Sequence, residues 1–546
     1  MKRYRIGQVL KFFFVFILLT VGSEKILAEA AEVRRATVNP QFSNYIINMY
    51  KKELLNKEGG TNLTAGVIPS PVQIEKNNII IKRDVTLPAS YDLRDYAKVS
   101  AVKNQGDIGG CWSFAAYASL ESNMLMQGLG AYDFSENNML THHGFDLALN
   151  DGGNINMSSA YLARWGGPVI EEKDLYPTIM RAENVTVRNG IAPDKHVQEI
   201  IFIPKRLNYM DNDDIKRAIM QYGAVDSSVN YLSYYYNAAT KAFYSTNEYA
   251  YANHEIAIVG WDDNYSASNF LVKPPGNGAF IVKNSWGSTW GDKGYFYVSY
   301  YDPVIGGENA AFNGVESNDN YYGIYQYDTL GMTSNFGYGS STAWFANVFT
   351  ANSSIEMNEE LAAVSFYTTK KNAQFDIYIK DNISGNDFSN MLKVKSGAIA
   401  MPGYHTIKLD SPISLSSGKR FAAAVKIYVP GEIYPIAVEY PILGYSGMAS
   451  AGAGESYVSA DGIVWEDLQY SSSNTNVCLK AFTLVESAKV KGDINNDYKV
   501  DIIDIALMAQ KYNVYKPSGL YEDKYDSNGD GIIDIYDMVF TAKKIK

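Results

Sequence analysis

The sequence of 546 residues has only two cysteines, Cys111 and Cys478, and they lie in very different surroundings. A disulfide between them is therefore not expected, so packing or bound metal must stabilise the protein. Positive charge is also in deficit, because a formal net charge of −11 disfavours nucleic acid and anionic membranes as partners. The length predicts about two to four domains, each large enough to bury a core.

Apolar runs long enough to cross a membrane are missing as well. The apolar run Phe12 to Val21 follows a basic start and is too short to span a bilayer. Ala28-Glu29-Ala30 then supplies a small-x-small cleavage pattern. Residues 1–30 are predicted to be a signal peptide, with an uncleaved anchor as the alternative. The prediction implies a secreted, extracellular protein without a transmembrane anchor.

The chain does have a cysteine in a reactive setting. Gly110-Cys111-Trp112 runs into a small, apolar segment, Ser113 to Leu120, which predicts a buried helix. A thiol in the first turn of a helix faces the positive end of the helix dipole, which favours the thiolate. The amide of Gln105 could point back at the target of the sulfur. The Cys111 thiolate and the Gln105 amide together would form half of an acyl-transfer site. The alternative is that Cys111 is only a small, buried core residue.

The flanking segments predict how this part of the chain is divided. Residues 31–86 are polar and are broken by Gly59-Gly60 and Pro69-Ser70-Pro71. A linker would look similar, but the position between a signal peptide and a thiol-enzyme motif favours a pro-segment. Residues 87–316 are predicted to form one domain, which begins with helices and ends with alternating, strand-like runs.

Ordered motifs in this domain resemble the papain-like cysteine peptidases. The matching residues are Val102-Lys103-Asn104-Gln105-Gly106, Gly110-Cys111-Trp112-Ser113-Phe114, Gly152-Gly153, His254 and Asn284-Ser285-Trp286-Gly287. The resemblance implies an α+β fold with two halves. A helical half carries Cys111, a β-barrel half carries His254 and Asn284, and the active cleft lies between them.

The resemblance also implies a catalytic mechanism. His254 would take the proton of Cys111 to give a thiolate–imidazolium pair, and Asn284 would hold the imidazole in orientation. Gln105 and the backbone N–H of Cys111 would form the oxyanion hole. Trp286 would shield the contact between His254 and Asn284 from water. This peptidase chemistry needs no cofactor.

Substrate contacts are predicted at Gly152, Gly153 and Trp286. The two glycines resemble the edge where an extended substrate pairs, although a simple turn would give the same sequence. The family's animal and plant members carry a disulfide-bonded cysteine where Ile108 stands, and residues 273–278 mark an inserted loop between His254 and Asn284. Subsite preference and the natural substrates are therefore left open.

Residues 317–486 change in character. Short alternating runs such as Phe375 to Ile379 and Phe421 to Tyr428 are separated by turn signals, which predicts an antiparallel β-sandwich. The segment looks like the lectin-like domain that follows papain-type peptidases in some anaerobic bacteria. It either binds carbohydrate through its aromatic side chains or serves as a structural accessory domain. Cys478 is predicted to lie in its core.

Residues 487–546 contain one acidic pattern twice, with the spacing of calcium loops, whose ligands stand at positions 1, 3, 5, 7, 9 and 12. The predicted ligands are Asp493, Asn495, Asp497, the Lys499 carbonyl, Asp501 and Asp504 in the first copy, and Asp526, Asn528, Asp530, the Ile532 carbonyl, Asp534 and Asp537 in the second. An apolar-periodic helix follows each copy. The module is therefore predicted to be small, all-α and to bind two Ca²⁺ ions.

This repeat resembles a dockerin, a module that attaches an enzyme to a cohesin on a scaffolding protein. The apolar pairs Ile502-Ile503 and Ile535-Tyr536, at matching places in the two copies, are predicted to face the cohesin. The whole chain is thus expected to be a secreted cysteine endopeptidase that cuts proteins or peptides and is attached to a cellulosome-like or cell-surface complex. The alternative is a non-catalytic peptide-binding or protease-inhibiting component of the same complex, which would not need the full catalytic set.

Overall fold

The computed structural model describes residues 32–55, 66–76, 86–352, 358–486, 492–495 and 500–545. The predicted signal peptide lies outside these residues, and so do Asp497 and Lys499 of the first predicted calcium loop. Within the described ranges, the search for a helix with the length and apolarity of a membrane span finds none.

The helix α2 begins at the predicted nucleophile. It has 17 residues and is buried on all sides from Cys111 to Met124, which explains why small and apolar residues surround the whole helix rather than one stripe. It ends at Gly128, whose φ of 73° forms a left-handed C-cap. The α-helices are α1 (Pro40–Leu55), α2 (Cys111–Gln127), α3 (Glu136–His142), α4 (Ile155–Ala163), α5 (Asp213–Tyr222), α6 (Leu468–Ser471), α7 (Ile502–Ala509) and α8 (Ile535–Ala542). Short 3₁₀ turns cover Leu93–Tyr96, Glu171–Lys173, Ala182–Asn184, Ser233–Tyr235, Ala267–Asn269 and Asp523–Tyr525.

A 13-stranded sheet forms the centre of the chain, in the order β11-β23-β14-β17-β3-β10-β4-β7-β8-β9-β6-β5, with β2 paired to β7. The strands are β2 (Ser90–Asp92), β3 (Lys195–Phe202), β4 (Val225–Val229), β5 (Tyr236–Asn237), β6 (Ala242–Phe243), β7 (His254–Asp262), β8 (Ala279–Lys283), β9 (Tyr295–Ser299), β10 (Asn309–Ser317), β11 (Gly323–Tyr325), β14 (Asn358–Thr368), β17 (Gly403–Ser414) and β23 (Leu479–Glu486).

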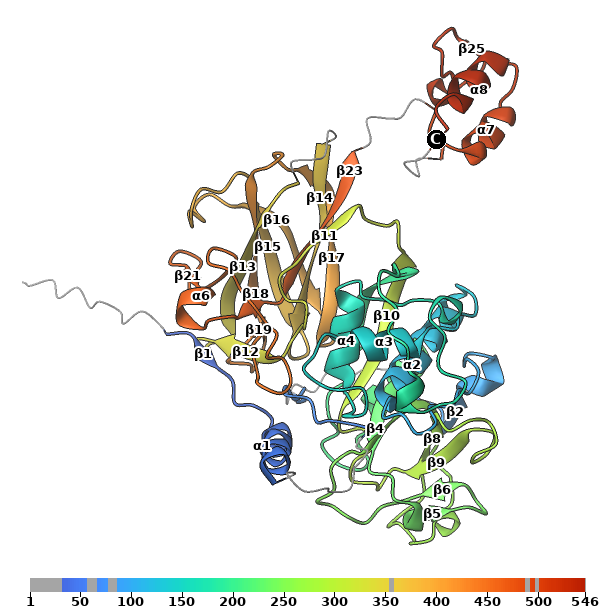
Figure 1. The fold of residues 1–546 in the computed structure, drawn as a ribbon, viewed down its shortest axis with the longest axis vertical. Helices are drawn as coiled ribbons and strands as arrows, with labels where there is room; N and C mark the ends of the chain where they lie inside the picture. Colours follow the sequence, from blue (N-terminus) through green and yellow to red (C-terminus); the bar gives the residue numbers. More distant parts are fainter. Residues whose placement is uncertain are drawn as a thin grey trace, which may run out of the picture. The chain divides into compact units, whose positions relative to one another are not determined.

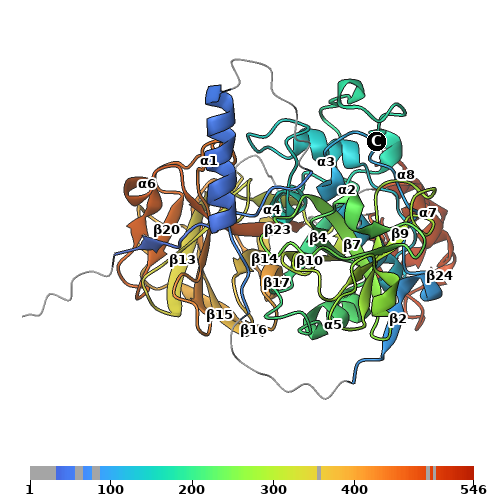
Figure 2. The same cartoon turned by 90° about the horizontal axis from the view of Figure 1, so that it is seen from below.

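The strand β7 is the one that positions the site. Eight of its nine residues are buried, because α2 packs against β4, β7 and β10 (Figures 1 and 2). The β half was expected to be a barrel, but its strands do not close on themselves in the described part of the chain. Instead the sheet continues from β4 through β10 and β3 into the next domain.

The predicted β-sandwich is confirmed. A six-stranded sheet, in the order β16-β15-β18-β13-β20-β21, faces the β14 end of the long sheet. Side chains from both layers, such as Phe345, Val425, Phe366 and Leu479, share one apolar core. The remaining strands are β13 (Thr342–Thr350), β15 (Ala373–Lys380), β16 (Leu392–Ile399), β18 (Arg420–Tyr428), β20 (Ser456–Ser459) and β21 (Glu466–Asp467), with β12 (Ser334–Gly337), β19 (Ile436–Glu439) and β22 (Asn476–Val477) in a smaller sheet.

The sandwich and the preceding domain share a sheet and a core. β17 pairs with β3 through Gly403 opposite Ile201 and His405 opposite Glu199. Cys478 lies in the same apolar cluster as Trp112, the residue that follows Cys111 in the chain. Both cysteines are buried and free, as the sequence predicts.

The segment before residue 87 contacts both of these parts. The strand β1 (Arg34–Arg35) extends the small sheet by pairing with β12, and the Arg35 guanidinium lies 3.7 Å from the centre of the Tyr440 ring. On α1, the buried Phe42 packs edge-on against Tyr445 at 5.0 Å between ring centres. The chain then returns at Gly66 beside the thiol of Cys111.

The C-terminal module contains α7 and α8 around a small core of Ile494, Met508, Tyr525 and Ile533. It is not wholly helical, because β24 (Val514–Tyr515) and β25 (Ile532–Ile533) form a two-stranded antiparallel sheet. Their pairing places β24, which follows α7, beside β25, which lies in the loop ahead of α8.

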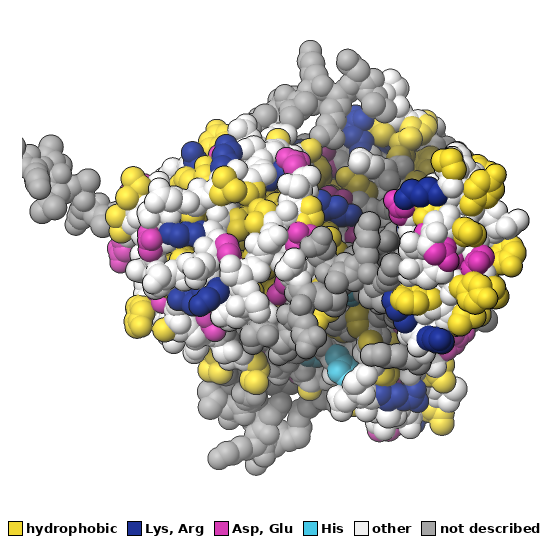
Figure 3. Space-filling model, turned by 90° about the horizontal axis from the view of Figure 1, so that it is seen from above, with side chains coloured by type: hydrophobic (Ala, Val, Ile, Leu, Met, Phe, Trp, Pro, Cys, Tyr) yellow, Lys and Arg dark blue, Asp and Glu magenta, His cyan; other side chains and the backbone are white. Residues whose placement is uncertain are grey.

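Charges of both signs lie side by side on the face of the molecule drawn in Figure 3. On the face in Figure 3, Lys and Arg side chains lie among Asp and Glu side chains. Ion pairs with at least one exposed side chain also occur, such as Lys408 with Glu316 at 2.9 Å. The face shown therefore carries no extended field of one sign.

Candidate active site

Cys111 is the first residue of α2 and is fully buried. Its Sγ atom accepts a hydrogen bond from the backbone N–H of Glu255 at 3.4 Å, and its S–H donates to the carbonyl of Gly66 at 3.1 Å. The thiol therefore lies at the meeting point of α2, the start of β7 and the segment that precedes the domain.

His254 and Asn284 lie side by side because β7 and β8 are antiparallel neighbours. The Nε2 atom of His254 is 2.7 Å from Oδ1 of Asn284. The indole of Trp286 stacks on the imidazole at 4.6 Å between ring centres, with 24° between their planes. Tyr231 and Trp290 in turn pack edge-on against Trp286 at 4.8 and 5.0 Å. The aromatic cover keeps water from the His–Asn contact and fixes the plane of the imidazole.

Gln105 is held at both ends of its side-chain amide. Its Oε1 accepts from the hydroxyl of Ser285 at 2.6 Å, and its Nε2 donates to the carbonyl of Ile108 at 2.9 Å. An amide nitrogen has two hydrogens, so one N–H remains for a ligand. The N–H of Cys111 belongs to the first helical turn, where backbone donors have no partner within the helix. Two donors can therefore serve one oxyanion.

Residues 66–76 lie across the cleft. The N–H of Ile68 donates to the carbonyl of Gly153 at 2.9 Å, the N–H of Gly153 donates to the carbonyl of Gly66 at 3.4 Å, and Val67 forms a parallel bridge with Gly153. Gly153 has room for no side chain, since a Cβ would stand 2.5 Å from the Trp112 indole. Its neighbour Gly152 has a φ of 88°. The predicted substrate edge thus pairs with a peptide of the chain itself.

Beside this segment the cleft opens into a cavity of about 470 Å³. Gly66, Gln105 and the following turn to Gly109 form one side, and Tyr231, Asn253, His254 and Trp286 form the other. The cavity therefore brings together three of the predicted site residues, Gln105, His254 and Trp286. Ile108, at the place of the family's disulfide cysteine, is 1% exposed and packs in the core instead.

Burial sets the protonation of the two reacting groups. Desolvation raises the pKa of the Cys111 thiol well above its ordinary range, and the nearby carboxyl of Glu255 adds to the effect. Desolvation also lowers the pKa of His254 to about 4, although the hydrogen bond to Asn284 opposes this. The sequence predicts a thiolate–imidazolium pair, but in the covered cleft both groups are neutral because the segment at Gly66 excludes the water that would stabilise two charges.

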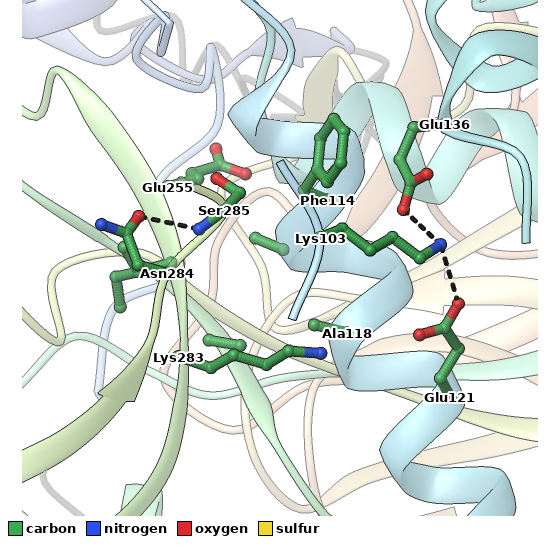
Figure 4. A pocket seen from close by; sticks show the side chains of 12 residues that line it. Lys103, Phe114, Ala118, Glu121, Glu136, Glu255, Lys283, Asn284 and Ser285 are labelled. Carbon is green, nitrogen blue, oxygen red and sulfur yellow. Dashed lines mark hydrogen bonds and ion pairs between the residues drawn. The ribbon is translucent and has the colours of Figure 1, made fainter. Parts of the chain in front are cut away.

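An ion cluster around Lys103 lies behind the cleft, and its carboxylates Glu121 and Glu136 are buried (Figure 4). Lys103 Nζ is 2.8 Å from a carboxylate oxygen of Glu136 and 3.3 Å from one of Glu121. It is also 2.6 Å from a carboxylate oxygen of the exposed Asp133. Lys103 is two residues before Gln105, while Glu121 lies on α2 and Glu136 on α3. The cluster thereby fixes the loop that carries Gln105 to the helix that begins with Cys111.

Sequence reasoning missed several residues of the site. Gly66 belongs to no motif, yet it covers the thiol. Three acidic residues from separate strands or loops, Asp226, Glu255 and Glu308, lie near one another behind the cleft. Burial raises the pKa of both Asp226 and Glu255, and the nearby carboxyl of Glu308 adds to the effect in each. No spacing in the sequence indicates this grouping, because long-range sheet pairing creates it.

The second predicted calcium loop is described in full. The carboxylate of Asp526 accepts from the N–H groups of Gly529 at 2.6 Å and of Gly531 at 2.8 Å, and Gly531 has a φ of 87°. Asp537 accepts from the N–H of Asn528 at 3.0 Å and caps α8. In the first copy, Asp504 accepts from the N–H of Ile494 at 2.7 Å and caps α7.

Both loops offer carboxylate, amide and carbonyl oxygens, which are the ligands that Ca²⁺ prefers, so their chemistry fits this ion. No three His, Cys, Asp or Glu side chains are gathered as a ready metal site among the residues described. The carboxylates at position 12 accept hydrogen bonds from backbone N–H groups of their own loops. The predicted partner-facing side chains are exposed: Ile502 by 70%, Ile503 by 51%, Ile535 by 50% and Tyr536 by 68%.

Comparisons with known proteins agree with this arrangement. Three family models match: "Papain family cysteine protease" at residues 87–314, "Lectin like domain" at 324–483 and "Dockerin type I domain" at 491–546. The chain is similar to the crystal structure of the cysteine protease and lectin-like domains of Cwp84, a surface layer associated protein of Clostridium difficile. The TM-score is 0.70 at 30% identity, over 83% of this chain and 98% of that one. A structure of the same protease after propeptide cleavage gives 0.64 at 32% identity, over 72% and 99%.

Curated relatives match a little under half of the chain. A viral cathepsin of Lymantria dispar multicapsid nuclear polyhedrosis virus is 30% identical over 47% of this chain, and fruit bromelain of Ananas comosus is 27% identical over 46%. The match spans 65% of the length of each of these two relatives.

Proposed function

Since the chain belongs to the papain family of cysteine proteases, we propose that it is a secreted endopeptidase that hydrolyses peptide bonds through Cys111, His254 and Asn284. His254 takes the proton of Cys111, and the thiolate attacks the scissile carbonyl carbon. The negative charge moves to the carbonyl oxygen, where Gln105 and the N–H of Cys111 stabilise it. When the C–N bond breaks, the proton on His254 passes to the leaving amine. Water then hydrolyses the thioester, again with His254 as base.

The arrangement of His254 supports this mechanism best. One ring nitrogen bonds to Asn284 at 2.7 Å, so the other is the one left to exchange a proton with the thiol. The stacked Trp286 prevents rotation of the ring. A protein that only binds peptides would need neither restraint.

The experiment compares two cysteine variants after the segment before residue 87 has been removed. Cys111→Ala should abolish hydrolysis of a mixed peptide substrate, and alkylation should do the same to the unmodified protein. Cys478→Ala is the matched control, because it removes the other buried thiol, which has no part in the proposed chemistry. Turnover by Cys111→Ala at the unmodified rate would rule out Cys111 as the nucleophile, whereas no turnover by the unmodified protein would leave it as a peptide-binding component.

Residues 31–86 are proposed to be an inhibitory pro-segment. The observation in favour is that Gly66 lies on the thiol while Ile68 occupies the hydrogen-bonding edge at Gly153. A substrate needs the same two places. Removal of the segment would therefore be the step that activates the peptidase.

The dockerin module is proposed to bind two Ca²⁺ ions and to attach the enzyme to a cohesin. The first ion would be held by Asp493, Asn495, Asp497, Lys499, Asp501 and Asp504, and the second by Asp526, Asn528, Asp530, Ile532, Asp534 and Asp537. Bound calcium would fix each loop ahead of its helix. Chelation should then abolish binding to a cohesin, and replacing both Ile502 and Ile535 with Asp should do so with calcium present.

The β-sandwich is proposed to act as a structural accessory domain. It shares the pairing of β3 with β17 and the core around Cys478 with the peptidase, so it supports the fold directly. Carbohydrate binding is the alternative, and a glycan array probed with the whole chain distinguishes the two roles.

A further inference from the structure

A loop of the sandwich reaches the predicted substrate edge of the peptidase. The loop connects β19 to β20 and carries Tyr445, which is completely buried. The hydroxyl of Tyr445 donates a hydrogen bond to Oδ1 of Asn154 at 3.0 Å. Asn154 follows Gly153 directly in the chain and is completely buried as well. A tyrosine 291 positions away therefore bonds to the residue next to the edge at Gly153.

This bond restrains the direction of the Gly153 carbonyl. The carbonyl belongs to the planar peptide unit between Gly153 and Asn154, so it can turn only if the backbone of Asn154 turns with it. Oδ1 of Asn154 accepts a second hydrogen bond, from the N–H of Met157 at 3.1 Å, and so caps the start of α4. An amide oxygen has two lone pairs, and the two donors use both. Asn154 is thus held by α4 on one side and by the sandwich on the other.

The sandwich loop is itself fastened to the peptidase. The carbonyl of Tyr445 accepts from the N–H of Asp146 at 2.9 Å, and the N–H of Gly447 donates to the carboxylate of Asp146 at 2.8 Å. The ring of Tyr445 packs against that of Phe145 at 4.9 Å between ring centres. None of these contacts involves the segment before residue 87, so removal of the segment takes none of them away.

Further bonds join α4 to the stretch between β11 and β12. The side-chain amide of Asn156, in the first turn of α4, donates to the carbonyl of Met332 at 2.9 Å. At the other end of α4, the guanidinium of Arg164 donates to the carbonyl of Thr329 at 2.8 Å. The helix that follows the edge at Gly153 is therefore attached at both ends to the part of the chain that forms the sandwich.

We propose that the sandwich positions the substrate edge, with Tyr445 as the positioning residue. By holding Asn154, Tyr445 directs the carbonyl of Gly153 toward an N–H group of the substrate backbone. The same carbonyl accepts the N–H of Ile68 at 2.9 Å in this structure, which shows the geometry that it offers to an extended peptide. Because Tyr445 acts through a group that binds substrate, its loss should weaken binding more than it slows the chemical step. The proposal rests on the peptidase function proposed above.

The test uses the whole chain with a recognition site for an unrelated protease inserted between residues 77 and 85, cut and freed of the segment. Tyr445→Phe removes the hydroxyl and keeps the ring. We expect its KM for a peptide substrate to rise about fivefold, the size of one neutral hydrogen bond, while kcat stays within about twofold of the unmodified value. Tyr404→Phe, which removes the hydroxyl of another buried tyrosine, on β17, should change neither constant.

A second measurement separates this role from a general loosening of the fold. The peptide is prepared with one backbone N–H at a time replaced by N–CH₃, which removes one donor. We expect Tyr445→Phe to reduce the cost of N-methylation about fivefold at one position, the N–H that meets the carbonyl of Gly153. The cost at the other positions should stay unchanged, whereas a loosened fold would affect all positions alike.

The outcomes separate the two proposals. If the unmodified protein cuts no peptide, the peptidase function itself is wrong. If peptides are cut but Tyr445→Phe has an unchanged KM, or changes the cost of N-methylation at every position alike, the role of Tyr445 is wrong and the peptidase function stands. Where Tyr445→Phe fails to fold, Asp146→Ala decides, because Asp146 is exposed and its carboxylate holds the same loop. It should also raise KM, and an unchanged KM there would overturn the proposal.

Discussion

The α-carbon of Gly66 lies over the thiol of Cys111, so closely that a Cβ atom at residue 66 would stand 2.6 Å from Sγ. No carbon tolerates such a contact, so a side chain here must displace the segment or the sulfur. The carbonyl of the same residue accepts the S–H bond of the thiol at 3.1 Å. Glycine thus allows the proposed pro-segment to touch the thiol of Cys111 directly.

Gly66→Ala is therefore expected to weaken the hold of the pro-segment. Overpacking by one methyl group costs about 1–3 kcal/mol, so the uncut chain should show roughly tenfold more peptide hydrolysis than the unmodified chain. Steady-state assays of the two uncut proteins measure this. Glu75→Ala is the control, since Glu75 is an exposed residue of the same segment. Equal latency of Gly66→Ala and the unmodified protein would show that the contact does not matter.

The thiol should titrate differently before and after the segment is removed. Burial raises the pKa of Cys111 and lowers that of His254 to about 4, so at pH 5–8 the covered pair is neutral. Alkylation of the uncut chain should therefore begin only above the ordinary thiol range near pH 8.5. Once water reaches the pair, the thiolate forms beside a protonated imidazole and the midpoint should fall below pH 7. The rate of alkylation against pH, measured in a Cys478→Ala background, reports one thiol alone. A midpoint that does not move on removal contradicts the burial argument.

Gln105→Ala should slow the reaction without removing the nucleophile. Loss of one oxyanion donor lowers kcat by about 10²–10³-fold. KM should change much less, because the donor acts on the charge that develops in the transition state. Gln127→Ala, at the end of α2, is the control for an amide outside the site. A change confined to KM would mean that Gln105 only positions the loop.

The two calcium loops should differ in affinity. Gly531 at position 6 of the second loop has a φ of 87°, which glycine adopts without strain. Tyr498 holds that place in the first loop and lies outside the described residues; a left-handed tyrosine costs about 1–2 kcal/mol. Calorimetric titration of Asp493→Ala, which leaves the second loop, should therefore give affinity up to about tenfold higher than Asp526→Ala, which leaves the first. Equal affinities would refute the strain argument.

The sequence predicted those parts of the site that short motifs carry. Cys111 begins a buried helix, and His254 contacts Asn284 through adjacent strands, as their residue types and order indicate. The acidic repeats were equally visible, although the carboxylates of Asp504 and Asp537 also cap helices. Ligand spacing and helix caps depend on residues that are close in the sequence, so the sequence alone can predict them.

The remaining features depend on contacts between distant residues. Glu308 meets Ser70 across 238 positions of the chain, and His405 on β17 pairs with Glu199 on β3. The open sheet in place of a barrel follows from that same pairing. Such contacts arise from packing between domains, where no residue type or spacing marks the partner.

The central claim is that a latent cysteine peptidase is held inactive by its own amino-terminal segment. Its most direct test is peptide hydrolysis by the whole chain before and after cleavage between residues 77 and 85, followed by addition of a synthetic peptide covering residues 32–86. We predict that the uncut chain is nearly inactive, that the cut and freed chain is active, and that the added peptide restores inhibition. Equal activity in all three states would contradict the account.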